Sequence, residues 1–178
     1  LNGLGKPGMG CTATCAYIEN DTLAIAHVGD SRAYLLHEGT LIRVTRDRSY
    51  VEELVDAGEI TADEARVHPN RSVITRALGS DPAMYADHFT LHIEEGDRLI
   101  LCSDGLSSMI PDSDIENIAT QSSTAQICVD NLVDAALAAG GHDNVTVVVV
   151  DLVDDGVMRE AQRVRRRNIT IAAILALV

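Results

Sequence analysis

The first part of the chain is a series of short apolar runs, each bounded by turn-forming residues. The runs are Cys11–Ile18, Thr22–Val28, Ala33–His37 and Thr40–Val44. Runs of this length and spacing predict four antiparallel strands in a meander. Leu23–Ala26 is apolar on both faces of a pleat, so its strand is expected to be central and covered on both sides.

The middle of the chain, residues 46–80, is polar and weakly periodic. Two capping-box patterns, Ser49-x-x-Glu52 and Thr61-x-x-Glu64, each predict the start of a short helix. We therefore expect an exposed, mobile subdomain in this region rather than part of the core.

Apolar strands resume after the polar middle and are followed by helices. Tyr85–Ile93 and Asp97–Cys102 are predicted strands, and Asn144–Val153 is the last one. Helices are predicted to begin near Pro111 and at Ser123. Strands first and paired helices late predict an α+β fold, an antiparallel β-sandwich of packed sheets flanked by helices.

Composition limits the classes of partner. The 178 residues suffice for one domain, and they include four Tyr, one Phe and no Trp,. The net charge is −13 at pH 7. An acidic chain with few aromatic residues is a poor nucleic-acid binder, so we expect no nucleic-acid partner. The four cysteines form no CxxC pair, which favours a reducing, cytoplasmic compartment,.

The tail differs from the body of the chain. Five arginines between residues 157 and 168 precede the apolar run 169–178. This order predicts a basic juxtamembrane segment followed by the start of a truncated transmembrane helix, after a domain at 1–156. The domain is then expected in the cytoplasm, anchored to the cell membrane. A basic amphipathic helix at the interface is the alternative.

Three aspartates, Asp30, Asp104 and Asp143, follow or precede strongly apolar strands and stand beside Gly or Asn. Carboxylates that converge at the rim of a sheet repel one another unless a cation neutralises them. Oxygen ligands of this kind suit Mg²⁺ or Mn²⁺. Alternatively, each aspartate belongs to an ordinary turn, where Gly-Asp and Asp-Gly pairs are common.

Six motifs occur in order along residues 8–150. They are Gly8-Met9-Gly10-Cys11-Thr12, Val28-Gly29-Asp30-Ser31-Arg32-Ala33-Tyr34, Val44-Thr45-Arg46-Asp47-Arg48-Ser49, Ile74-Thr75-Arg76-Ala77-Leu78-Gly79, Leu101-Cys102-Ser103-Asp104-Gly105-Leu106 and Asp143-Asn144-Val145-Thr146. This series resembles the PPM (type 2C) family of metal-dependent serine/threonine protein phosphatases. The Arg-rich and then apolar tail is most similar to the bacterial, membrane-tethered branch.

The resemblance implies α-β-β-α layers, here incomplete at the amino terminus, with a flap at about 46–80 beside the site. It also implies hydrolysis of phosphoserine and phosphothreonine in proteins at a binuclear Mn²⁺ or Mg²⁺ centre. The implied partners are phosphorylated proteins, including Ser/Thr kinases and the substrates of those kinases. In that role the protein opposes Ser/Thr kinases in bacterial signalling.

Site residues follow from the same resemblance, motif by motif. Asp104 and Asp143 match ligands of the binuclear centre, and Asp30 matches the residue that holds a third, weaker metal together with Asp104. Asn144 is expected to support the site. His142 is either a supporting group or a surface histidine. Arg76 is either a phosphate contact or a salt-bridge partner within the flap.

The chain also departs from the family pattern. The amino-terminal part of the domain, which supplies a phosphate-binding Arg and an Asp-Gly pair, is not in this sequence. We therefore expect the chain to be inactive by itself. Arg48 replaces a usual His. A phosphatase-like binding module without turnover stays open as an alternative function, as does a generic acidic cation-binding domain.

Overall fold

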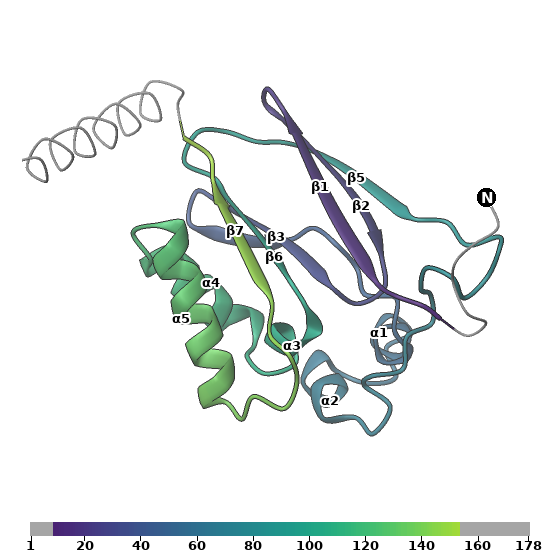
Figure 1. Ribbon diagram of the computed structural model, residues 1–178. Helices are drawn as coiled ribbons and strands as arrows, with labels where there is room; N and C mark the ends of the chain where they lie inside the picture. The colour runs from purple at the N-terminus through teal and green to yellow at the C-terminus, as the bar shows by residue number, and fades with distance from the viewer. Residues whose placement is uncertain (1–8, 154–178) are drawn as a thin grey trace, which may run out of the picture.

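The computed structural model describes residues 9–153 (Figure 1). Seven strands and five helices lie in this part of the chain. In chain order they are β1 (Ala13–Glu19), β2 (Thr22–Val28), β3 (Arg32–His37), β4 (Thr40–Arg43), α1 (Tyr50–Asp56), α2 (Ala62–Val67), β5 (Asp87–His92), β6 (Arg98–Cys102), α3 (Asp104–Ser107), α4 (Asp112–Gln121), α5 (Ala125–Ala138) and β7 (Val147–Asp151).

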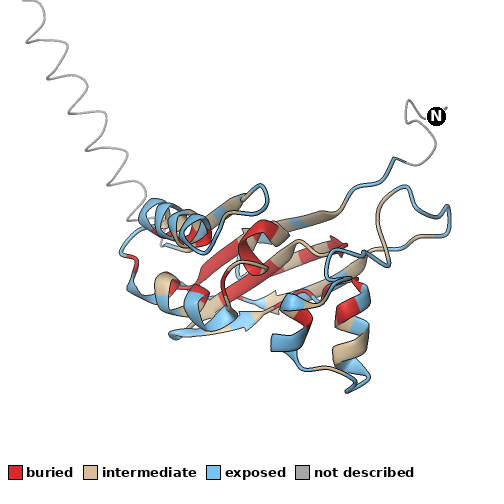
Figure 2. Ribbon diagram, turned by 90° about the horizontal axis from the view of Figure 1, so that it is seen from below, coloured by how far each residue is buried: buried red, intermediate tan, exposed pale blue. Residues whose placement is uncertain are grey.

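The strands form two antiparallel sheets, ordered β1-β2-β5 and β4-β3-β6-β7. One apolar cluster joins the two sheets, with Leu23 and Ile25 of β2 packed against Leu35 and Leu99. A second cluster joins the larger sheet to α3, α4 and α5 (Figures 1 and 2). The predicted α+β fold with antiparallel packed sheets and helices is confirmed.

The predicted four-strand meander is wrong, because β2 and β3 belong to different sheets. The chain crosses between the sheets at Gly29, which has a φ of +107°. A Cβ there would lie 2.3 Å from Cγ2 of Thr12, so only glycine fits the crossing,. The turn at Gly29 is thus not a hairpin, and β2 and β3 diverge into the two sheets.

Strand β2 is central in its sheet, as predicted, but only one of its faces is buried. Leu23 and Ile25 point into the sandwich, whereas Ala24 and Ala26 on the opposite face are partly exposed. Within residues 9–153 the helices α3–α5 cover the larger sheet, so three of the four expected layers are present (Figure 1). The expectation of cover on both sides of β2 is therefore wrong for the described residues.

The predicted capping patterns are found in part at the starts of the helices. Thr61 and Glu64 form both halves of the predicted capping box. At α1, Ser49 accepts a hydrogen bond from the Glu52 N–H, but the Glu52 carboxylate pairs with Arg43 instead of returning to the backbone. The cap of α5 is Thr124, one residue after the predicted start.

Arg98 of β6 ties the larger sheet to its helical layer. Its buried guanidinium forms a two-bond ion pair with Asp151 of the edge strand β7, at 2.5 and 3.1 Å. It also donates to the carbonyl oxygens of Ala119 and Ser122, 2.6 and 2.9 Å away, at the end of α4. Carbonyl groups at the end of a helix lack hydrogen-bond donors within the helix, and the Arg98 guanidinium supplies donors to these two.

The flap predicted at 46–80 contains α1 and α2, which pack against each other. The boundaries proposed for the domain stay predictions. The basic segment 157–168 and the apolar run 169–178 lie outside the described residues. Among the helices of residues 9–153, none has the length and apolarity needed to cross a bilayer.

Candidate metal-binding site

Asp30, Asp104 and Asp143 come from three separate segments and line a single cavity of about 400 Å³. Asp30 lies in the crossing between β2 and β3, Asp104 begins α3 directly after β6, and Asp143 lies between α5 and β7. The flap helices α1 and α2 form the opposite wall. The predicted convergence of the three strand-end motifs is therefore seen in the fold.

Close backbone packing holds the segments of Asp104 and Asp143 together. A Cβ on Gly105 would lie 2.4 Å from the carbonyl oxygen of Asn144, so a larger residue would push the two segments apart. Ser103 links them further, since its hydroxyl donates to the Asn144 carbonyl and accepts from the N–H of Thr146. The close packing against Asn144 thus explains why glycine follows Asp104 in this motif.

Asn144 acts on the site through its backbone. Its N–H donates to Oδ1 of Asp143 at 2.7 Å, which orients that carboxylate. His142 lines the same cavity. Its part in metal binding stays a prediction, as do the ligand roles of the three aspartates.

Electrostatics in the cavity favour a cation. Burial, followed by the charges of Asp104 and Asp47, raises the pKa of Asp30 to about 6. Burial and the charge of Asp143 raise the pKa of Asp104. A hard divalent cation would offset this repulsion with the oxygen ligands that it prefers, so the residues fit Mn²⁺ or Mg²⁺. In residues 9–153, no three His, Cys, Asp or Glu side chains are already close enough to hold an ion together.

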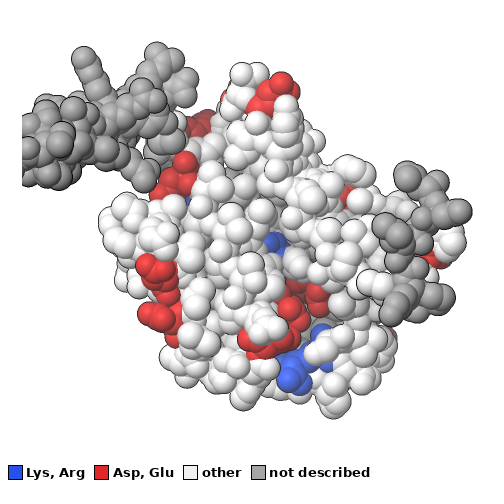
Figure 3. Space-filling view, viewed as in Figure 1, with Lys and Arg blue, Asp and Glu red and all other residues white. Residues whose placement is uncertain are grey.

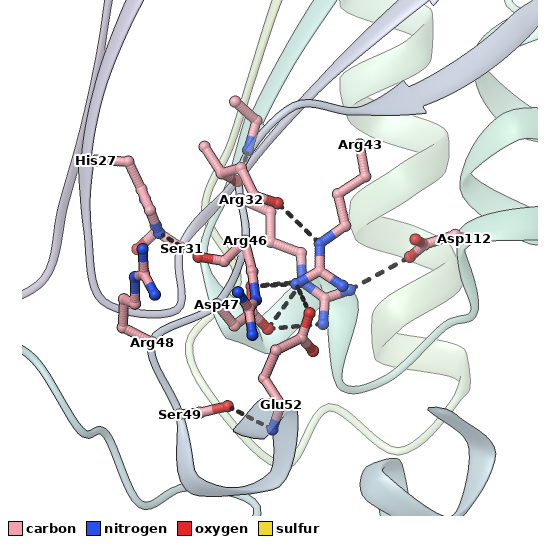
Figure 4. A network of polar contacts seen from close by, with 12 residues as sticks. His27, Ser31, Arg32, Arg43, Arg46, Asp47, Arg48, Ser49, Glu52 and Asp112 are labelled. Carbon is pink, nitrogen blue, oxygen red and sulfur yellow. Dashed lines mark hydrogen bonds and ion pairs between the residues drawn. The ribbon is translucent and has the colours of Figure 1, made fainter. Parts of the chain in front are cut away.

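Asp47, to which the sequence reasoning gave no role, is one of four further acidic residues that line this cavity. Its contacts are drawn in Figure 4. It is almost fully buried and accepts from Arg32 at 2.8 Å, and Arg43 pairs with it at 2.8 Å. Arg43 also pairs with Glu52 of α1 at 2.9 Å, and Arg32 reaches Asp112 at the start of α4. This Asp47 network joins the flap to the larger sheet.

Arg76 lies away from the cavity. Its guanidinium is 3.4 Å from Asp87, donates to the Tyr85 hydroxyl at 2.9 Å and stacks 4.0 Å from the Tyr85 ring. Arg48, whose role was in doubt, forms a two-bond pair with the same Asp87, with both N···O distances 2.6 Å. The contacts that Arg76 makes are those of a salt-bridge partner, whereas a phosphate contact for Arg76 stays a prediction.

Comparison with known proteins identifies the family of this chain. Residues 6–145 match the family described as protein phosphatase 2C. The chain belongs to the protein phosphatase 2C family. A serine/threonine phosphatase stp of Listeria welshimeri is 39% identical over 144 residues, which are 81% of this chain and 57% of that relative. The chain thus spans little more than half the length of this curated family member.

Solved structures of the family have the same fold. The Mycobacterium tuberculosis serine/threonine phosphatase PstP/Ppp superposes with a TM-score of 0.78 at 42% identity, over 83% of this chain and 62% of that one. The catalytic domain of PstP in complex with two manganese ions gives a TM-score of 0.75 at 40% identity, over 83% and 61% of the two chains.

The buried His27 is expected to make the stability of this phosphatase 2C domain depend on pH. The ring is buried between Thr14 Oγ1, 2.9 Å away, and the Arg46 carbonyl oxygen, 3.1 Å away. Burial lowers its pKa below 6.5, against the charges of Asp47 and Asp87. The unfolded chain therefore takes up this proton first, and the stability due to neutral His27 is lost as pH falls below 6.5.

We expect the free energy of unfolding of the wild-type protein to fall more steeply between about pH 7 and about pH 5.5 than that of His27→Gln. Urea unfolding of both proteins at the two pH values measures the difference. Comparing the two proteins cancels the opposite contribution of Asp30, which they share. Equal changes in the two proteins would contradict the burial of a neutral His27.

Proposed function

We propose that the full-length protein containing this chain is a metal-dependent protein-serine/threonine phosphatase. The observation that carries the proposal is the convergence of Asp30, Asp104 and Asp143 on one cavity. It is supported by family membership and by relatives that are named serine/threonine phosphatases. A related catalytic domain that binds two manganese ions supports the same cofactor here.

In this proposal Asp104 and Asp143 hold the two tightly bound cations, and Asp30 together with Asp104 holds a third, weaker one. Bound there, the cations supply an activated water and offset charge on the phosphoryl oxygens. The chain contributes the positions of the ligands. The Asn144 N–H orients Asp143, and the packing of Gly105 on Asn144 sets the spacing between the two segments.

The proposed substrates are phosphorylated proteins, including Ser/Thr kinases and the proteins that those kinases modify. The protein would oppose the kinases in bacterial signalling. We also propose that the arginines after residue 156 and the apolar run beyond them anchor a cytoplasmic domain to the cell membrane. Charge order along the sequence supports this orientation, because basic residues flank membrane spans on the cytoplasmic side,.

Phosphate release from a phosphothreonine peptide tests the proposal on the full-length protein. We expect turnover with Mn²⁺, loss of turnover on addition of a chelator, and recovery when Mn²⁺ is restored in excess. Turnover that persists after complete chelation would contradict the metal-dependent mechanism. Peptide binding without phosphate release would instead favour the alternative, a binding module without catalysis.

A further inference from the structure

Most of the basic side chains in residues 9–153 already have acidic partners. These residues contain eight arginines and no lysine. Six arginines lie within 4.0 Å of a carboxylate, namely Arg32, Arg43, Arg46, Arg48, Arg76 and Arg98. Arg66 and Arg71 are the two that have no such ion pair within the described part of the chain.

These two arginines, which lack an ion pair, also lie in the same part of the structure. Both line the cavity that holds the three aspartates, and both come from its flap wall. Arg66 is in the last turn of α2, and Arg71 lies in the turn that follows, where its N–H donates to the His68 carbonyl. Arginine side chains are seen beside acidic ones at the end of the molecule where α2 lies (Figure 3).

The fold holds the flap wall in place. Ala65 of α2 is buried, and α2 packs on α1. Helix α1 is in turn fastened to β4 through the 2.9 Å pair between Glu52 and Arg43 (Figure 4). Arg66 is therefore carried on a helix whose position over the cavity is set by packing and by an ion pair.

The other cavity arginines are not available to a ligand in the same way. The charges of Arg32 and Arg43 are offset by Asp47, Asp112 and Glu52. Arg66 is half-buried and Arg71 is exposed, so both guanidinium groups can meet a molecule that enters between the flap and the aspartates. Guanidinium groups pair with carboxylates through two parallel hydrogen bonds.

We propose that Arg66 and Arg71 form an anion subsite on the flap that binds acidic side chains flanking the phosphorylated residue of a protein substrate. The proposal rests on the proposed function and adds a preference among substrates. The phosphoryl group itself belongs at the opposite wall, where cations can bind the aspartates. A peptide spanning the cavity would then place a neighbouring Glu or Asp against the flap.

Two phosphothreonine peptides that differ only in having Glu or Gln beside the phosphorylated residue provide the test. The full-length protein is assayed with Mn²⁺ as wild type, Arg66→Gln, Arg71→Gln and the double variant. The readout is the ratio of kcat/KM for the acidic peptide to kcat/KM for the neutral one. Arg46→Gln is the matched control, because Arg46 pairs with Asp56 and does not line the cavity.

We expect the wild type to prefer the acidic peptide, and each single variant to lose about two- to fivefold of that preference, as for a partly exposed ion pair. The double variant should lose most of it, and Arg46→Gln should keep it. Raising the salt concentration should also reduce the wild-type preference, since exposed charges are screened.

An unchanged ratio in the double variant would overturn the subsite. So would an equal fall in kcat/KM for both peptides, which would instead indicate that the arginines hold the phosphoryl group or support the flap. Fluorescence anisotropy with the same labelled peptides separates this inference from the proposed function. If no turnover is found, tighter binding of the acidic peptide to wild type than to the double variant still supports the subsite, and equal binding contradicts it.

Discussion

Asp143→Asn and Asp104→Asn should each lower kcat of the full-length protein on a phosphothreonine peptide by more than about 100-fold. Groups that only orient a metal ligand already cost about 10- to 100-fold when removed, so loss of a ligand should exceed that. The substitution keeps the shape of the side chain but removes its negative charge, on which a hard cation depends. Steady-state phosphate release at saturating Mn²⁺ measures the effect.

The control for this prediction is Asp114→Asn, on an exposed position of α4 that does not line the cavity. We expect its kcat to equal that of the wild type. Circular dichroism and thermal unfolding of each variant separate loss of the site from loss of the fold. A folded Asp143→Asn protein with kcat within a few-fold of wild type would refute the assignment of Asp143.

Asp47→Asn should lower the free energy of unfolding by about 3 kcal/mol, the usual cost of removing one partner from a buried ion pair. The Asp47 side chain is only 9% exposed, and it neutralises both Arg32 and Arg43. A neutral amide would leave two guanidinium groups close together with insufficient opposing charge. Urea unfolding of the full-length protein measures the loss.

Asp56→Asn makes the same chemical change at an exposed ion pair, with Arg46. It should cost less than about 1 kcal/mol, as exposed pairs usually do. A small loss in both variants would show that the Asp47 network does not hold the flap to the sheet. A large loss in Asp47→Asn alone would support the network as the anchor of α1.

Local patterns predicted the seven strands, four of the five helices and the class of fold, but they missed the short helix α3. They also drew attention to the three cavity aspartates, whose expected roles came from the family resemblance. Asp30, Asp104 and Asp143 each stand at the end of an apolar run, and strand ends lie at the rim of a sheet. Asp47 also follows such a run, at Thr40–Val44, so the same signal could have identified it. Its arginine partners could not be assigned, because Arg32 lies in a neighbouring strand and pairs with it through the tertiary fold.

The errors in the sequence-based fold have a common physical origin in non-local contacts. Whether β2 pairs with β3 or with β5 depends on residues more than sixty positions apart, such as Ile25 and Phe89. Glu52 illustrates the same point for a helix start, since a charged partner, Arg43, competes with the backbone N–H for its carboxylate. The two flap arginines without an ion pair, Arg66 and Arg71, could not be recognised from the sequence either. Recognising them requires the tertiary partners of the other arginines.

Calorimetric titration of the full-length protein with Mn²⁺ tests the central claim most directly, that the cavity aspartates bind the metal. Wild type should show tight binding together with a weaker site. Asp143→Asn should lose tight binding, whereas Asp30→Ala should keep it and lose only the weakest site. Tight Mn²⁺ binding that survives in Asp143→Asn, or that disappears in Asp30→Ala while the weak site remains, would contradict the account.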